Sequence, residues 1–144
     1  MLGNQFFLAR NYAAAAEQLE EALLRDPSNK SILRKIIICL NEIGEIRRAL
    51  THFISLIKED ADYIINTDPV ADDCPCAELV YEAERKLYNN LDSVDFALRL
   101  GMLWLYCDAK ESIRYFQEAH NLAPDDGDVK SILTLLKTKQ TVPN

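Results

Sequence analysis

The amino-acid sequence predicts an all-α protein built from antiparallel helix-turn-helix repeats. Apolar residues recur at the three- and four-residue spacing of a helix face along most of the chain, and no segment has the two-residue alternation of a strand. Similar residues also recur at an interval of 34 residues, which is the length of a two-helix repeat. These observations predict about seven helices joined by short turns.

Three amphipathic segments fill the first half of the chain. In the first segment, Ala15 and Leu19 share one face, and Pro27 ends the helix because proline disfavours helical geometry in the residue before it. Gly44 ends the second segment, and Pro69 lies beyond the third. The expected helices cover residues 6–24, 32–42 and 45–66.

Residues 67–75 separate these helices from the rest of the chain. This segment contains two prolines and three aspartates but no periodic apolar face, so it is expected to be an irregular loop. Pro75 suits the first turn of the next helix, and Asp92 or Ser93 suits the cap of the one after it. The later helices are expected over residues 76–88, 94–106, 110–121 and 129–137.

Negative charge is concentrated in the middle of the chain. The net charge is -7, and residues 59–95 alone carry 11 acidic and 2 basic side chains. We expect a single helical domain over residues 1–138, with an irregular acidic segment at 59–75 and a frayed tail at 139–144. The acidic surface would repel nucleic acid and attract a basic partner.

The recurring residues resemble the tetratricopeptide repeat family. The likeness covers most of the chain, and the residues that carry it are Leu2-Gly3, Phe6, Ala15, Leu19, Ala22 and Asp26-Pro27 in a first unit; Leu33, Leu40, Gly44, Ala49 and Phe53 in a second; and Leu100-Gly101, Trp104, Phe116, Ala119 and Pro124 in a last. The resemblance implies an α-α superhelix of about three to four degenerate repeats. In such packing, small residues such as Gly3 and Gly101 let helices approach closely, and large ones such as Phe116 fill the space between them.

The resemblance also implies a function. Members of the family bind a peptide or a partner helix in a groove lined by the first helix of each pair, so the chain is expected to be a protein-interaction adaptor or scaffold, without a cofactor and not an enzyme. Transferred to this chain, the expected partner-binding residues are Asn4, Arg34, Lys35, Ile38, Asn41, Arg99, Met102 and Tyr106, with Leu8 and Asp95 beside them. The basic residues would favour an acidic partner segment, unless they are only solvated helix faces.

Cys74-Pro75-Cys76 is the one motif that could carry chemistry. Two thiols beside Asp72 and Asp73 could bind zinc or cycle through oxidation, which makes a thiol redox or zinc-binding protein one alternative. Structural zinc usually takes four ligands with wider cysteine spacing, and acidic neighbours disfavour a thiolate. The motif therefore favours a structural role, with Pro75 starting a helix and one or both cysteines packed beneath it, and no metal site is expected.

Several function classes are disfavoured by what the sequence lacks. No apolar run approaches the roughly 20 residues of a membrane span, and the N-terminus lacks the pattern of a secretory signal. Cys39 and Cys107 lie in apolar helical patterns typical of free thiols, and reduced cysteines fit a cytoplasmic protein. Nucleophile motifs and phosphate-binding glycine loops are absent. A small acidic secretion-type chaperone remains a second alternative, and an exposed patch at Phe6, Phe7 and Leu8 could mediate self-association.

Overall fold

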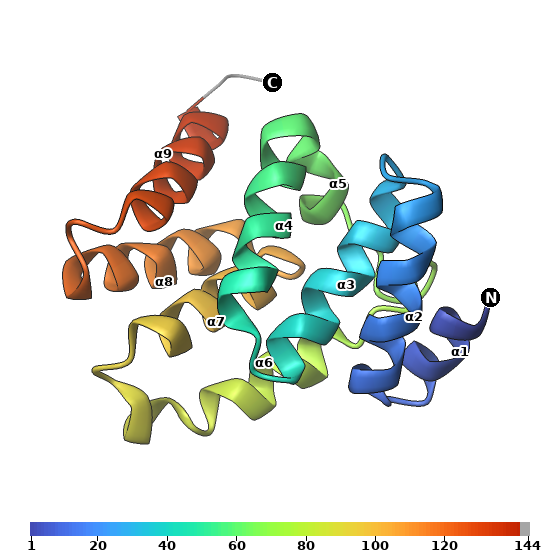
Figure 1. The fold of residues 1–144 in the computed structure, drawn as a ribbon. Helices are drawn as coiled ribbons and strands as arrows, with labels where there is room; N and C mark the ends of the chain where they lie inside the picture. Colours follow the sequence, from blue (N-terminus) through green and yellow to red (C-terminus); the bar gives the residue numbers. More distant parts are fainter. Residues whose placement is uncertain (142–144) are drawn as a thin grey trace. The chain divides into compact units, whose positions relative to one another are not determined.

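The structure is a computed structural model that describes residues 1–141. Within this range every regular element is a helix, which confirms the all-α fold class (Figure 1). The described residues form nine α-helices and one 3-10 helix, more than the seven expected, because some of the expected helices are divided. The chain forms two compact units, Met1–Leu56 and Ile57–Asn144. The sequence predicts a single domain over residues 1–138 and does not predict this division.

Unit 1 contains three helices and most of a fourth. Its helices are α1 (Leu2–Leu8), α2 (Tyr12–Arg25), α3 (Lys30–Glu42) and α4 (Ile46–Asp60), the last of which crosses the boundary between the units. Helix α2 packs against both α1 and α3. The side chains of Asn11 and Asn29 cap α2 and α3 by accepting hydrogen bonds from the backbone N–H groups of Ala14 and Ile32, at 3.3 and 3.1 Å.

The single helix expected over residues 6–24 is wrong, because the chain turns between α1 and α2. Arg10 adopts a left-handed conformation with φ of 62°, and Asn11 N–H donates to Phe6 O at 2.9 Å across the turn. Arg10 N–H donates to Phe7 O at 3.0 Å, which completes the Schellman arrangement of a helix C-terminus. The same arrangement ends α3, where Gly44 has a φ of 84°.

Unit 2 contains the remaining elements. After α4 come α5 (Asp62–Ile65), α6 (Cys76–Glu84), the 3-10 helix η1 (Leu87–Asn90), α7 (Val94–Leu105), α8 (Ala109–Leu122) and α9 (Gly127–Thr141). Helix α7 packs against both α6 and α8, and α8 also packs against α9. Ser93 and Asp108 cap α7 and α8 with their side-chain oxygens.

Three expected boundaries in unit 2 need correction. The helix expected over residues 45–66 is divided at Ala61 into α4 and α5. The helix expected over residues 76–88 ends at Glu84, because Lys86 N–H donates to Ala83 O at 3.0 Å and the chain tightens toward the 3-10 geometry of η1. The tail expected to begin at residue 139 is helical through Thr141, and residues 142–144 lie outside the described part.

Two glycines mark close contacts between paired helices. A Cβ atom on Gly3 of α1 would lie 2.9 Å from Leu19 Cγ of α2, and a Cβ atom on Gly101 of α7 would lie 2.9 Å from the Phe116 ring of α8. Ser112 adds a hydrogen bond from its hydroxyl to Gly101 O at 2.6 Å. The same device, a helical glycine against a large side chain, therefore occurs once in each unit, as the small-and-large packing pattern predicts.

No helix within the described residues is both long enough and apolar enough to cross a lipid bilayer.

Candidate functional site: an apolar pocket and a disulfide loop in unit 2

Two of the predicted partner-binding residues meet in unit 1. Lys35 Nζ donates a hydrogen bond to Asn4 Oδ1 at 3.0 Å and lies 5.7 Å from the centre of the Phe7 ring. Phe7 is 1% exposed and packs edge-on against Tyr12, with ring centres 6.1 Å apart. The expected exposed patch at Phe6, Phe7 and Leu8 is thus wrong for Phe7, whose ring is part of the core.

Most of the other predicted residues are buried. The exposed fractions are 8% for Arg34, 2% for Ile38 and 0% for Met102, and Arg99 is partly exposed. Asn41 and Tyr106 are buried as well, and the Asn41 amide donates to Ile37 O at 2.9 Å within its own helix. Their part in binding stays a prediction, and in this conformation the apolar anchors Ile38, Met102 and Tyr106 do not offer an open surface.

Unit 2 contains an apolar pocket that the sequence does not predict, called here the α7–α8 pocket. Its volume is about 160 Å³, and its lining comes from η1, α7, α8 and the turn after η1. The lining residues are Leu87, Asn90, Leu91, Ser93, Ala97, Arg114, Tyr115, Glu118 and Leu122. An apolar cavity of about 150 Å³ accommodates benzene, so this pocket has room for one branched or aromatic side chain.

The polar groups of this pocket are largely engaged within the protein. Arg114 Nε and Nη2 donate to Glu111 Oε2 at 3.1 and 2.7 Å, and the guanidinium lies 4.5 Å from the centre of the Tyr115 ring. The Asn90 amide donates to Lys86 O at 2.7 Å, and Ser93 Oγ accepts from Phe96 N–H at 3.0 Å. Since these groups already have partners, the pocket suits an apolar ligand group better than a polar one.

Two leucine side chains of the pocket lining are exposed, and an exposed tyrosine lies close to one of them in the sequence. Leu91 is 59% exposed and Leu122 is 40% exposed, and the neighbouring Tyr88 is 86% exposed. Exposed apolar and aromatic side chains around a concavity are typical of protein-interaction surfaces. The sequence signal for this edge is that Leu91 and Leu122 stand at the ends of helical segments, outside any face that the periodicity assigns to the core.

Tyr115 in the pocket lining and Trp104 both donate hydrogen bonds to one carboxylate, that of Glu84. Glu84 Oε1 accepts hydrogen bonds from Trp104 Nε1 at 2.9 Å and from the Tyr115 hydroxyl at 2.8 Å. Burial, together with the hydrogen bond to Glu84, raises the pKa of Tyr115 above its ordinary value. Tyr115 therefore keeps its proton at neutral pH and presents its ring to the pocket.

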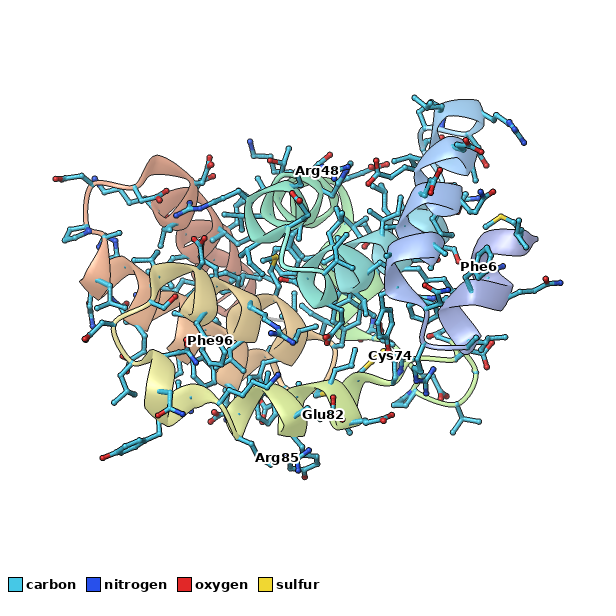
Figure 2. The ribbon with its side chains drawn as sticks, turned by 60° about the horizontal axis from the view of Figure 1, so that its bottom comes forward. Phe6, Arg48, Cys74, Glu82, Arg85 and Phe96 are labelled. Atoms are coloured by element: carbon cyan, nitrogen blue, oxygen red, sulfur yellow. A yellow bond between two sulfur atoms is a disulfide. The ribbon has the colours of Figure 1, made fainter. Side chains whose placement is uncertain are left out.

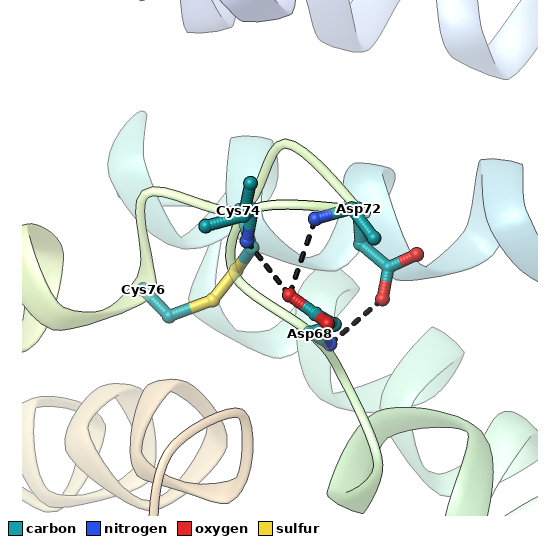
Figure 3. Close-up of a disulfide and its surroundings, with 6 residues drawn as sticks. Asp68, Asp72, Cys74 and Cys76 are labelled. Carbon is teal, nitrogen blue, oxygen red and sulfur yellow. Dashed lines mark hydrogen bonds between the residues drawn. A yellow bond between two sulfur atoms is a disulfide. The ribbon is translucent and has the colours of Figure 1, made fainter.

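The second candidate site is the loop before α6, where Cys74 and Cys76 form a disulfide (Figure 3). Their Cα atoms are 5.2 Å apart, within the ordinary range for a disulfide. The free thiols expected at Cys39 and Cys107 are not part of this bond. The expected packing beneath the helix holds for Cys76, which is 2% exposed at the first position of α6, whereas Cys74 is partly exposed.

The loop that carries the disulfide is irregular, as predicted, yet well ordered by its aspartates. Asp68 Oδ1 accepts from the N–H groups of Val70 and Ala71 at 3.0 and 3.2 Å, and Asp72 Oδ2 accepts from Asp68 N–H at 2.8 Å (Figure 3). Asp73 is left-handed with a φ of 53°. The side-chain hydrogen bonds of Asp68 and Asp72 to nearby backbone N–H groups therefore hold residues 68–72 in one turn ahead of Cys74.

The remaining cysteines are not part of this loop. Cys39 is a buried free thiol, and its burial raises the pKa to about 12, so it is a core residue without reactivity at neutral pH. Cys107 is an exposed free thiol. Among the residues that the structure describes, no group of three or more His, Cys, Asp and Glu side chains is placed to hold a metal ion.

Comparison of the chain with known protein families, with characterised proteins and with solved structures found no match.

Proposed function

We propose that the protein is an adaptor that binds a partner protein through an apolar side chain inserted into the α7–α8 pocket of unit 2. The observation that carries this proposal is the pocket itself, a concavity of about 160 Å³ with Leu91 and Leu122 exposed at its edge. The polar groups of Asn90, Ser93 and Arg114 in its lining are engaged internally, which favours an apolar anchor over a polar one.

The resemblance to tetratricopeptide repeats also supports the adaptor proposal. The contacts of Gly3 with Leu19 and of Gly101 with Phe116 are the kind of close helix pairing that such repeats use. The Asn4–Lys35 pair in unit 1 is a separate candidate contact, since the same resemblance assigns both residues to partner binding. The pocket binds the partner without carrying out a reaction on it.

A peptide selection tests the pocket although its partner is unidentified. Random peptides are displayed and selected on the immobilised wild-type protein, and the enriched peptides are then measured against three variants, Leu91→Glu, Leu24→Glu and Lys35→Glu. Leu91→Glu places a charge at the pocket edge, whereas Leu24→Glu changes an 83% exposed leucine in unit 1 and serves as the matched control. Circular dichroism establishes that all variants are folded.

We expect enriched peptides to share an apolar or aromatic anchor and to bind Leu91→Glu on the order of tenfold more weakly than wild type, since burying a charge against an apolar anchor is unfavourable. Binding to Leu24→Glu should be unchanged. Equal affinity for Leu91→Glu and wild type would rule out the pocket. Loss of binding in Lys35→Glu with retention in Leu91→Glu would instead favour the predicted residues of unit 1.

A further inference from the structure

The disulfide between Cys74 and Cys76 is poorly suited to stabilising the fold. It spans only Pro75, so it closes a ring that restricts little of the unfolded chain. In the chain-entropy account, the stabilisation from a disulfide grows with the length of the loop that it closes. Because this disulfide spans a single residue, linking distant segments of the chain does not explain its presence.

The backbone holds the two cysteines together through contacts that do not involve sulfur. Cys74 N–H donates to Pro69 O at 3.0 Å and Asp73 N–H donates to Val70 O at 3.3 Å, which with the left-handed Asp73 forms a Schellman arrangement. Pro75 follows with its ring-restricted backbone and leads directly into α6. Because these contacts do not depend on the sulfur–sulfur bond, the same backbone suits the disulfide and the dithiol.

The two sulfur atoms lie in different environments. Cys74 belongs to the loop and is partly exposed. Figure 2 shows it near the N-terminal end of α6, whereas the exposed Glu82 and Arg85 lie toward the C-terminal end. Cys76 is buried at the first position of α6, and Pro75 at the N-cap supplies no side-chain acceptor for the first amides of the helix. An incoming thiolate therefore reaches Cys74 more readily than Cys76. The N-terminus of α6 favours negative charge on the departing Cys76, whereas the burial of Cys76 opposes that charge.

We propose that the Cys74–Cys76 pair undergoes thiol–disulfide exchange with a partner protein that carries two thiols among basic residues. The partner thiolate attacks Cys74 Sγ, the Cys74–Cys76 bond breaks, and Cys76 leaves as a thiolate that takes a proton from water. The partner's second thiolate then attacks the mixed disulfide and releases Cys74, so that the partner is oxidised to a disulfide and this protein is reduced to a dithiol. The reverse sequence restores the starting state.

The charge around the loop determines the class of partner. Asp68, Asp72 and Asp73 precede Pro75 in the same loop, within the segment 59–95 whose net charge is strongly negative. These carboxylates repel anionic thiols and attract cationic ones over a distance set by ionic strength. A basic thiol partner is therefore favoured over glutathione, which is an anion.

Small thiols of different charge test both the exchange reaction and the preference for a basic partner. The protein carries Cys107→Ser so that the exposed free thiol does not interfere, and cysteamine, 2-mercaptoethanol and 2-mercaptoethanesulfonate are supplied at equal thiolate concentration. Acid quenching and mass spectrometry follow the opening of the disulfide, and circular dichroism follows the helices. We expect native-state reduction with unchanged helical signal, and cysteamine on the order of tenfold faster than the sulfonate at low salt.

The Asp73→Asn variant is the matched charge control, because asparagine also tolerates the left-handed conformation. This variant should reduce the difference between the rates at which cysteamine and 2-mercaptoethanesulfonate open the disulfide. Added salt should reduce the same difference. Equal rates for the three thiols would overturn the basic partner. Reduction that requires denaturant, or that abolishes the helical signal, would overturn the exchange and identify the disulfide as a structural bond.

Single-cysteine variants test the assigned order of attack. With cystamine, and in the Cys107→Ser background, Cys76→Ser should form a stable mixed disulfide at the partly exposed Cys74, because the neighbouring thiol that would resolve it has been removed. Cys74→Ser should react on the order of tenfold more slowly, since Cys76 is buried. Equal trapping in both variants would overturn the assignment of Cys74 as the attacked sulfur.

Discussion

Glu84 accepts a hydrogen bond from the Trp104 indole at 2.9 Å, which joins α6 to α7 through side chains. The same carboxylate oxygen accepts the Tyr115 hydroxyl of α8 at 2.8 Å, so one acceptor serves donors from two other helices. Each of these interactions is partly buried, where an unmade hydrogen bond is costly. Glu84 is therefore a polar link among α6, α7 and α8, beside the α7–α8 pocket.

We expect Glu84→Ala to lower the free energy of unfolding by about 1–3 kcal/mol, because two partly buried donors lose their acceptor. Urea denaturation followed by circular dichroism measures this change. Glu82→Ala on the exposed side of the same helix is the control and should change stability by less than about 0.5 kcal/mol (Figure 2). Equal effects of the two substitutions would show that the shared carboxylate contributes little.

Gly44→Ala tests the left-handed end of α3. Nothing lies within 4 Å of a Cβ atom at this position, so the cost of the substitution comes from the φ of 84° alone. We expect a loss of about 1–2 kcal/mol in thermal or urea unfolding. Gly127→Ala, which also meets open space but has no positive φ, should be neutral or slightly stabilising. A neutral Gly44→Ala would contradict the described turn.

Gly101→Ala tests the close contact between α7 and α8. Alanine is the better helix former by about 1 kcal/mol, yet its Cβ atom would lie 2.9 Å from the ring of the fully buried Phe116. We expect the overpacking to dominate, with a net loss of about 1–3 kcal/mol. The double variant with Phe116→Leu should recover part of that loss in a double-mutant cycle. Stabilisation by Gly101→Ala would mean that the helices are not this close.

Cys39 gives a prediction for alkaline pH. Its folded pKa is raised to about 12 by burial, whereas an unfolded thiol titrates near its ordinary value of about 8.5–9. The folded state thus holds its proton more tightly, so the stabilisation is complete below about pH 9 and is lost as pH rises toward 12. Between these limits the wild type should lose stability more steeply than Cys39→Ala, as measured by urea unfolding at successive pH values. Parallel pH profiles would show that the thiol ionises without penalty.

The periodicity of apolar residues predicts most helices correctly, but it does not locate every end. Gly44 is recognisable as a helix end because glycine favours a left-handed conformation. Arg10 adopts the same conformation at the end of α1, yet arginine carries no such signal, so the break before α2 is marked instead by Asn11, whose side chain caps α2. Asp73 completes a similar turn within the loop, where the sequence indicates only irregularity.

The candidate sites are less predictable than the helices, for a reason of geometry. Periodicity identifies an apolar face but not whether another element covers it, and Ile38 and Met102, assigned to a groove, are buried. The α7–α8 pocket combines Leu87, Leu91 and Leu122, which lie on different elements or at their ends, and only the packed structure brings them together. The cysteine motif is evident in the sequence, whereas its disulfide depends on the backbone of the preceding turn.

The position of Trp104 also gives the protein a built-in optical reporter. It is the only tryptophan in the chain, and it lies in unit 2 with its indole bound to Glu84. Tryptophan emission therefore follows unit 2 alone, whereas the far-ultraviolet helical signal comes from both units. Separate midpoints for the two signals would resolve the order in which the units unfold, without any added label.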